Sequence, residues 1–327
     1  MKNQNKKYKT ALTVGKFAPL HHGHMMLIDK ALQETEHLFV IIYDSPLHTD
    51  LPLVVRAQWL RSLYPQLTVI EGWNVPTDEG WTDEIQQKHE NFIINLLDGQ
   101  KIDAFYSSEA YGFRMSLALG CENEIVDLDR NTIAITGTDI RRDPYEYRKY
   151  LHPVVYSDFI TKVLFYGGNE AITEKLVHTL SSVYETSCVK HGLQYGHVDQ
   201  ITEKTTEAQF ESQMLNFVKK IEAATQDANK FLFIQSGLLE INFKSKLIHH
   251  RDHPKLYKIA AEHMPQPDII FVIAQEDEVK DRQIIGELKF RNMPYIYLSG
   301  SFESQLEQID IVLNKYNKFM NPIDLKI

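Results

Sequence analysis

The sequence has little cysteine and no long apolar run. Its two cysteines, Cys121 and Cys188, lack the C-x-x-C spacing of zinc and redox sites, so we expect reduced thiols in a cytoplasmic protein. The longest apolar runs, Leu38–Tyr43 and Asp268–Ala274, are strand-sized and far below the roughly 20 residues of a membrane-spanning helix. The first residues also lack the apolar segment of a secretory signal. We therefore expect no membrane contact.

Basic side chains are outnumbered as well. The chain has 44 acidic and 35 basic residues, a formal net charge of −9, and no local basic tract. Binding to nucleic acid depends on clustered positive charge, so no nucleic-acid partner is expected. The length of 327 residues and the 43% hydrophobic content favour two globular domains of ordinary size.

Apolar, β-rich runs alternate with segments of helical period, which is typical of βαβ units on a parallel sheet. In the first half these are Ala11–Val14, His24–Thr35, Leu38–Tyr43, Leu53–Leu63, Leu67–Ile70, Thr82–Leu97 and Ile102–Tyr106. In the second half they are Lys162–Tyr166, Ala171–Ser182, Thr205–Thr225, Phe231–Ile234, Asp268–Ala274, Glu278–Arg291, Tyr295–Leu298 and Phe302–Lys318. The fold class is therefore expected to be α/β in both halves.

A segment dense in tyrosine and charge interrupts this alternation. It covers Arg141–Asp158 and contains Pro144 and Pro153, which favour a connector over a regular element. We expect a first domain at residues 1–150, a connector at 151–160 and a second domain at 161–327.

The segment GKFAPLHHGH, residues 15–24, lies between a predicted strand and an amphipathic helix. Gly15 permits a tight turn, Gly23 lets backbone approach a ligand, and the helix start attracts anions. His21 and His24 are three residues apart, so both rings can face one side and donate N–H groups to phosphate oxygens. Helix capping or a metal site are the alternatives, but no carboxylate or cysteine stands at metal-ligand spacing.

A second segment, ITGTDIR, follows a predicted strand at Asn131–Ile135. The hydroxyls of Thr136 and Thr138 and the backbone of Gly137 suit phosphate oxygens, and Arg141 supplies a permanent cation. By itself such a pattern is typical of a helix cap followed by a surface arginine. Paired with the first segment, it indicates a nucleotide site.

Together the two segments resemble the nucleotidyltransferase superfamily, whose signatures are HxGH and S/T-x-T-x-x-R. With SSE at 107–109, DLDR at 127–130 and ITGTDIRRDPYEY at 135–147, the chain more narrowly resembles the NadR-type bifunctional proteins. In that family a nicotinamide mononucleotide adenylyltransferase precedes a ribosylnicotinamide kinase of P-loop type. The resemblance implies a Rossmann-like nucleotidyltransferase domain followed by a P-loop-kinase-like domain. No preceding DNA-binding domain of the kind that some members carry is expected, because Gly15 already belongs to the first motif.

The resemblance also implies substrates and roles. ATP and nicotinamide mononucleotide are the expected substrates, with Mg²⁺ accompanying ATP. The expected catalytic residues are His21, His24, Lys16 and Arg141, and the expected nucleotide-binding residues are Gly15, Phe17, Gly23, Thr136, Gly137 and Thr138. For the acceptor, the indole of Trp81 suits stacking on a cationic pyridinium ring, and Asp44 follows the second strand, where ligands of open α/β sheets bind. Trp59 has core spacing and is expected to be structural.

The second half departs from the family pattern. A working P-loop reads G-x-x-x-x-G-K-[ST], but alignment on Gly167 puts Ile172, Thr173 and Glu174 at its last three required positions. Lys175 is no substitute, because two helical positions rotate a side chain by about 200°. Gln235, Ser236 and Gly237 stand where a carboxylate is expected, and the segment Glu276–Glu278 is acidic where a kinase lid carries arginine. We predict that kinase activity has been lost.

Two other functions remain open. One keeps the chemistry but uses another phosphate acceptor, such as a phosphopantetheine or flavin mononucleotide. The other is a non-catalytic sensor of NAD precursors. The sequence does not decide whether the chain forms a homo-oligomer. The histidine-rich segment His249–His253 is expected to be a solvated loop.

Overall fold

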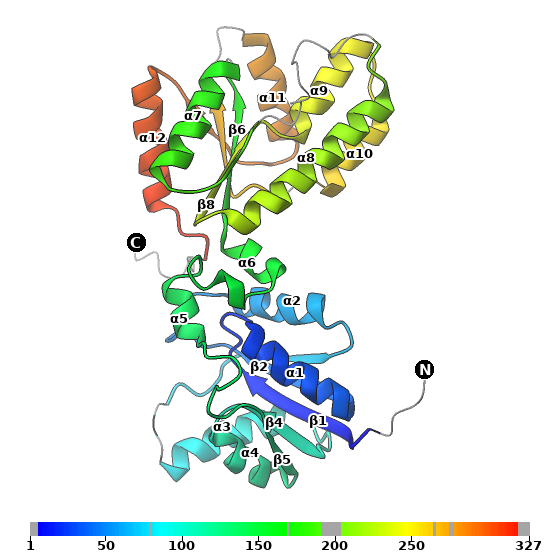
Figure 1. The fold of residues 1–327 in the computed structure, drawn as a ribbon, viewed down its shortest axis with the longest axis vertical. Coiled ribbons are helices and arrows are strands. Elements are labelled where there is room, and N and C mark those ends of the chain that lie inside the picture. Colours follow the sequence, from blue (N-terminus) through cyan, green and yellow to red (C-terminus); the bar gives the residue numbers. More distant parts are fainter. Residues whose placement is uncertain are drawn as a thin grey trace. The chain divides into compact units, whose positions relative to one another are not determined.

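The computed structural model describes residues 6–78, 80, 82–168, 170–190, 204–263, 266–274 and 278–319. The chain divides into two compact units. The first takes the residues up to Tyr156 together with Phe319, and the second is Ser157–Lys318. Each unit is an α/β structure built on its own parallel sheet (Figure 1).

The sheet of the first unit has the order β3-β2-β1-β4-β5, and all its paired strands are parallel. The strands are β1 (Tyr8–Gly15), β2 (Thr35–Tyr43), β3 (Thr68–Gly72), β4 (Ala104–Ser107) and β5 (Glu122–Ile125). This is a Rossmann-like order, in which the chain changes direction across the sheet between β1 and β4. Ligands of such sheets bind in the crevice at the carboxyl ends of the strands on either side of that point.

The helices of the first unit are α1 (His22–Glu34), α2 (Leu53–Leu63), α3 (Asp83–Leu96), α4 (Tyr111–Leu119) and α5 (Gly137–Arg142), with a 3-10 turn at Arg148–Tyr150. Helix α6 (Pro153–Phe159) contains the point at which the chain passes from the first unit to the second. In α1 the buried residues Leu27, Ile28 and Ala31 form one stripe, which accounts for the helical period of the sequence. The loops that follow β1 and β4 lie at the carboxyl ends of these two strands.

The sheet of the second unit has the order β10-β9-β6-β8-β7 and is again parallel. Its strands are β6 (Thr161–Gly167), β7 (Cys188–Val189), β8 (Phe231–Gln235), β9 (Ile269–Ile273) and β10 (Ile296–Leu298). Its helices are α7 (Glu170–Val183), α8 (Glu207–Asp227), α9 (Leu238–His249), α10 (Pro254–His263), α11 (Glu278–Phe290) and α12 (Phe302–Lys315). Phe165, Phe233 and Phe271, from its three central strands, lie in one core cluster.

Three expectations about elements are wrong. The segment Arg141–Asp158 was expected to be irregular, but it contains a 3-10 turn and most of helix α6, because Pro153 suits the first position of a helix. The predicted strand Asn131–Ile135 is a loop, because the backbone N–H groups of Thr132 and Ile133 donate to the Asp127 carboxylate instead of a neighbouring strand. The segment His249–His253 is not wholly solvated, because the His253 side chain is buried among α8, α9 and α10. Among the described residues, no helix has both the length and the apolar character to cross a bilayer.

Candidate active site

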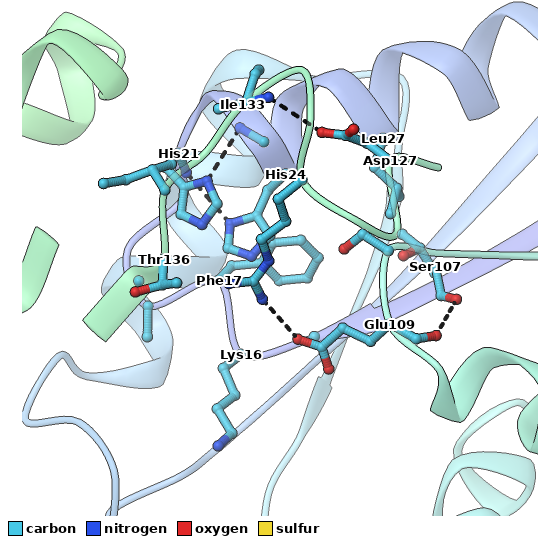
Figure 2. Close-up of a pocket in the computed structure, with 18 of the residues that line it drawn as sticks. Lys16, Phe17, His21, His24, Leu27, Ser107, Glu109, Asp127, Ile133 and Thr136 are labelled. Atoms are coloured by element: carbon cyan, nitrogen blue, oxygen red, sulfur yellow. Dashed lines mark hydrogen bonds and ion pairs between the residues drawn. The ribbon is translucent and has the colours of Figure 1, made fainter. Parts of the chain in front are cut away.

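A cavity of about 370 Å³ lies at the carboxyl ends of β1 and β4, at the crevice that the strand order creates (Figure 2). Both sequence segments line it. Gly15 is the last residue of β1, Thr136 caps the start of α5, and Arg141 lies within α5. The structure thus brings together residues that are more than a hundred positions apart in the sequence.

His21 and His24 cap helix α1 reciprocally. The His21 Nδ1 accepts a hydrogen bond from the Gly23 N–H at 3.1 Å, and the His24 Nδ1 accepts from the His21 N–H at 3.4 Å. Their rings stack with centroids 3.8 Å apart. A Cβ atom on Gly23 would lie 3.0 Å from the His21 ring, so a glycine there allows the ring its position. The two histidines are therefore helix caps, as the alternative reading held, and they also line the cavity.

The environment keeps both imidazoles neutral near pH 7. Burial and the charges of Arg130 and His22 lower the pKa of His21 to about 4. Burial and the neighbouring His21 lower the pKa of His24 well below its ordinary range, although its hydrogen bond to the Pro19 backbone acts in the opposite direction. These groups can donate hydrogen bonds, but they add no positive charge to the cavity.

The tautomer of each imidazole follows from its hydrogen-bond partners. The His21 Nδ1 is an acceptor, so the neutral ring carries its proton on Nε2, which can donate to a ligand oxygen. The His24 Nδ1 is also an acceptor, and the His24 ring has a further hydrogen bond to the Pro19 backbone. The hydrogen bonds of the His24 ring thus go to backbone groups, so we assign it a supporting place, while the Nε2 of His21 has a proton to offer.

Phe17 and Gly15 shape the base of this arrangement. Phe17 is buried, has a backbone φ of 46°, and presents its ring to His24 at a centroid distance of 5.0 Å. A Cβ atom on Gly15 would lie 3.2 Å from the Phe17 ring. Both residues line the cavity, and their contacts fix the His24 ring.

The second segment is tied directly to the first. The Arg141 guanidinium donates to the carbonyl of Ala18 and, at 3.1 Å, to the Thr138 hydroxyl. A Cβ atom on Gly137 would come within 2.8 Å of the Ala18 oxygen, so this approach of two backbones needs a glycine. The Thr136 hydroxyl caps α5 by accepting from the Asp139 N–H at 3.0 Å.

A buried arginine that the sequence did not reveal holds the neighbouring loops. Arg56 in α2 is fully buried and donates to the carbonyls of Leu51, Lys16 and Tyr43. Burial lowers its pKa to about 10, so it stays charged at neutral pH. It also lies 3.4 Å from the Asp44 carboxylate. One cation thus joins the first motif, the end of β2 and the chain before α2.

A second cavity of about 160 Å³ adjoins the first and shares Lys16, Tyr43 and His48 with it. Asp44 lines this smaller cavity, and its carboxylate accepts from the Ser45 N–H at 2.9 Å. Trp81, the expected stacking residue, lies outside the described residues. Trp59 is buried in α2, in keeping with a structural role.

Further lining residues come from the SSE and DLDR segments, which supported the family resemblance but whose residues were given no individual role. Glu109 and Asp127 lie on the opposite side of the cavity from His21 and Thr136 (Figure 2). Arg130 lines the same cavity and pairs with Glu109. In the part of the chain that the structure describes, no group of three or more His, Cys, Asp or Glu side chains is arranged to hold a metal ion.

In the second unit, the strand-to-helix connection is short. Strand β6 ends at Gly167 and α7 begins at Glu170, whereas a P-loop has four residues between its glycines. Thr173 is buried and its hydroxyl donates to the Gly167 carbonyl at 3.0 Å. Glu174 forms an ion pair with Lys190 at 2.7 Å. The side chains at the lysine and hydroxyl positions of the motif are thus engaged within the protein.

Comparisons with known proteins agree with this architecture. Residues 12–143 match the model of the cytidylyltransferase-like family. The chain is 26% identical over 272 residues to the trifunctional NAD biosynthesis/regulator protein NadR of Escherichia coli K12, and 26% identical over 270 residues to its Salmonella typhimurium LT2 counterpart. These matches cover 76% of this chain and 65% of the length of either relative, so the chain spans about two thirds of them. The chain is homologous to NadR.

Solved structures extend the likeness to the fold of both units. A crystal structure of a NadR protein in complex with NAD and AMP-PNP matches with a TM-score of 0.55 and 18% identity, covering 95% of this chain and 97% of that one. A crystal structure of a NadR protein in complex with NR matches with a TM-score of 0.55 and 19% identity, covering 96% of this chain and 97% of that one. The first unit is accordingly a cytidylyltransferase-like domain, and the second is P-loop-kinase-like in fold.

Proposed function

We propose that the first unit is a nicotinamide mononucleotide adenylyltransferase, which makes NAD and pyrophosphate from ATP and the mononucleotide. The observation that carries this proposal is the cavity in which the HxGH segment and the Thr136–Arg141 segment meet, tied by the Arg141 hydrogen bond to Ala18. The homology to NadR supports the choice of acceptor.

The reaction needs positioning and charge compensation. An oxygen of the 5′-phosphate of the mononucleotide attacks the α-phosphorus of ATP, and a new P–O bond forms. The bond from that phosphorus to the bridging oxygen of the β-phosphate breaks, and pyrophosphate leaves with the electron pair. No covalent enzyme intermediate is needed, so the protein contributes orientation and fixed donors.

Each donor has a place in this scheme. The His21 Nε2–H donates to an oxygen of the reacting phosphate, while Lys16, Thr138 and Arg141 bind the triphosphate. His24 acts through His21, because the His24 ring is hydrogen-bonded to the backbone of His21 and Pro19. Gly15, Phe17, Gly23, Thr136 and Gly137 shape the nucleotide site through the contacts described above.

Mg²⁺ enters this reaction as part of the substrate. We propose that it arrives bound to the triphosphate oxygens of ATP, where it neutralises part of their charge. The protein contributes cationic and hydrogen-bonding side chains around the same oxygens, among them Lys16 and Arg141.

The smaller cavity beside Lys16 is the proposed acceptor site. Asp44 would accept hydrogen bonds from ribose hydroxyls there, and Trp81 is retained as the stacking residue for the pyridinium ring. A different phosphate acceptor is the second candidate. An acceptor panel with nicotinamide mononucleotide, its acid form, phosphopantetheine and flavin mononucleotide separates the two.

We propose that residues 161–327 form a kinase-like domain without ribosylnicotinamide kinase activity, joined by the connector at 151–160 to the adenylyltransferase domain at 1–150. The short connection after β6 and the internal engagement of Thr173 and Glu174 support the loss. A P-loop uses a lysine to bind the phosphates and a hydroxyl to bind the metal, and Thr173 and Glu174 at these two positions provide neither group.

The test of the main proposal is a product assay. Purified protein incubated with ATP, Mg²⁺ and nicotinamide mononucleotide is expected to release NAD and pyrophosphate in equal amounts. Arg141→Ala should lower kcat/KM by about 10²–10³, the usual effect of removing a transition-state donor. Lys175→Ala in the second unit is the matched control and should keep the wild-type rate. Absence of product from the wild type, with all acceptors, would reject the proposal.

A further inference from the structure

The loop between β5 and α5 places an arginine, Arg130, in the cavity. This residue belongs neither to the segment 15–24 nor to the segment 135–141. Arg130 lines the cavity, and its Nη2 lies 3.6 Å from the Oε1 of Glu109, which follows β4. Both side chains are partly exposed, at 44% for Arg130 and 60% for Glu109. A long, solvent-exposed ion pair contributes little stability and is easily exchanged for a better one.

Hydrogen bonds within the loop fix the backbone position of Arg130. The Asp127 carboxylate accepts from the N–H groups of Thr132 at 3.0 Å and Ile133 at 3.2 Å, and the Arg130 N–H donates to the Asp127 carbonyl at 2.9 Å. Asp127 and Arg130 have backbone φ values of 53° and 52°, which non-glycine residues adopt only when surrounding contacts hold them. The side chain is therefore anchored at a defined place beside the cavity.

The cavity needs the charge that Arg130 carries. His21 and His24 are neutral, so positive charge comes only from guanidinium and ammonium groups. After burial, Arg130 is the largest influence lowering the pKa of His21, which places its charge beside that ring. Arg141 already donates from both terminal nitrogens, to Ala18 and to Thr138.

From these contacts we propose that Arg130 is a triphosphate-binding residue that exchanges partners, leaving Glu109 for the phosphate oxygens of ATP. The inference rests on the proposed function for the identity of the nucleotide. A phosphate group offers a guanidinium two parallel, charge-assisted hydrogen bonds, which the 3.6 Å contact to Glu109 does not provide. Glu109 is then an internal competitor that sets the affinity for ATP.

Binding of α,β-methylene ATP with Mg²⁺, measured by calorimetry, tests this exchange. Arg130→Ala should weaken binding at least tenfold, and Arg130→Lys should recover part of the loss because it keeps the charge without the planar fork. Glu109→Gln should tighten binding several-fold, because the competing carboxylate is gone. In the Arg130→Ala background, Glu109→Gln should have no such effect, since the two act on one interaction.

The matched control is Arg61→Ala in α2. Arg61 is equally exposed, at 44%, and forms an ion pair with Glu71 at 2.7 Å, but it does not line the cavity. Its variant should bind the analogue like the wild type. An unchanged dissociation constant in Arg130→Ala, or a Glu109→Gln effect that persists without Arg130, would overturn the inference.

The binding assay separates this inference from the proposed function. If the analogue binds with the expected dependence on Arg130 but no NAD is formed, the proposed function fails and the arginine exchange stands. If NAD is formed at wild-type rates by Arg130→Ala with an unchanged KM for ATP, the inference fails and the proposed function stands.

Discussion

At the scale of single residues, the site depends on imidazoles that stay neutral. His21 is buried, its Nδ1 accepts from the Gly23 N–H, and its ring stacks on His24. A protonated ring at this position would lose the Nδ1 acceptor and would face the charge of Arg130. In the function proposed above, His21 therefore supplies a hydrogen-bond donor to phosphate, while the arginines and Lys16 supply the charge.

The first prediction concerns the pH dependence of His21. Its pKa is lowered from the ordinary value near 6.5 to about 4. Between these two values the unfolded chain binds a proton that the folded protein does not. The contribution of the neutral ring to stability is thus fully present above pH 6.5 and is lost as the pH falls towards 4, by at most about 1.4 kcal/mol per pH unit.

An NMR titration of the imidazole resonances measures this directly, with His21→Gln to identify the signal. The His21 resonance should show no transition between pH 6 and 8 and a midpoint near 4. A midpoint near 6.5 would show that the ring is not held in its neutral form.

At the scale of elements, the site requires the loop after β1 and the start of α5 to touch. Gly137 makes this possible, because any larger side chain would meet the Ala18 carbonyl. Arg141 then bridges the same two segments. The geometry of the proposed phosphate site is therefore a property of the contact between two elements, and neither segment supplies it alone.

Gly137→Ala should separate these elements and lower kcat/KM for NAD formation by about tenfold or more, since small displacements of catalytic groups have such effects. The added Cβ would lie 2.8 Å from the Ala18 oxygen. Gly286→Ala in α11 is the control, because its Cβ would meet nothing within 4 Å. Equal rates for both variants would show that the close approach is not needed.

A histidine pair, of which His253 is buried and His249 half-buried, joins three helices of the second unit. The His249 Nε2 lies 2.6 Å from the Thr205 carbonyl, its Nδ1 lies 2.7 Å from the His253 Nε2, and the His253 Nδ1 lies 3.2 Å from the Glu207 carboxylate. Helix α10 begins at Pro254, directly after His253. The imidazole of His253 therefore connects the start of α10 to α8 and α9.

Removing this link should destabilise the second unit. His253→Ala is expected to lower the free energy of unfolding by about 1–3 kcal/mol, because it removes a buried side chain and its hydrogen bond to the half-buried His249. His178→Ala, on the exposed face of α7, should change it little. Urea unfolding followed by circular dichroism measures both, and equal midpoints would contradict a structural role for the pair.

At the scale of the whole molecule, the two units share an α/β construction but differ in the chemistry at their strand ends. The first presents Lys16, Arg130 and Arg141 around a cavity of about 370 Å³. In the second, the positions that a P-loop reserves for lysine and hydroxyl hold Thr173 and Glu174, which bond within the protein. We expect one nucleotide-transfer centre in the chain.

Nicotinamide riboside and ATP should accordingly yield no nicotinamide mononucleotide. The assay uses labelled riboside and separates products by chromatography, with the adenylyltransferase reaction of the same sample as the positive control. Formation of the mononucleotide would show that the second unit transfers phosphate by a route that the P-loop comparison does not capture.

The sequence predicted much of this arrangement because its signals are local. The βαβ rhythm marked most strands and helices, and the glycines and histidines of residues 15–24 lie at a strand-to-helix turn as expected. Helices α4, α6, α9 and α10 were missed. The role of Arg56 was beyond reach, because its partners include a carbonyl 40 residues away. Arg130 belongs to the DLDR segment of the resemblance, but its partner lies at another strand end and could not be foreseen. Such roles exist only after folding.

The most direct measurement of the central claim is a crystal structure of the protein with α,β-methylene ATP and Mg²⁺. The account predicts triphosphate density in the first unit, within hydrogen-bond distance of His21, Arg130 and Arg141. Density found only beside Thr173 in the second unit, with none near His21, would contradict it.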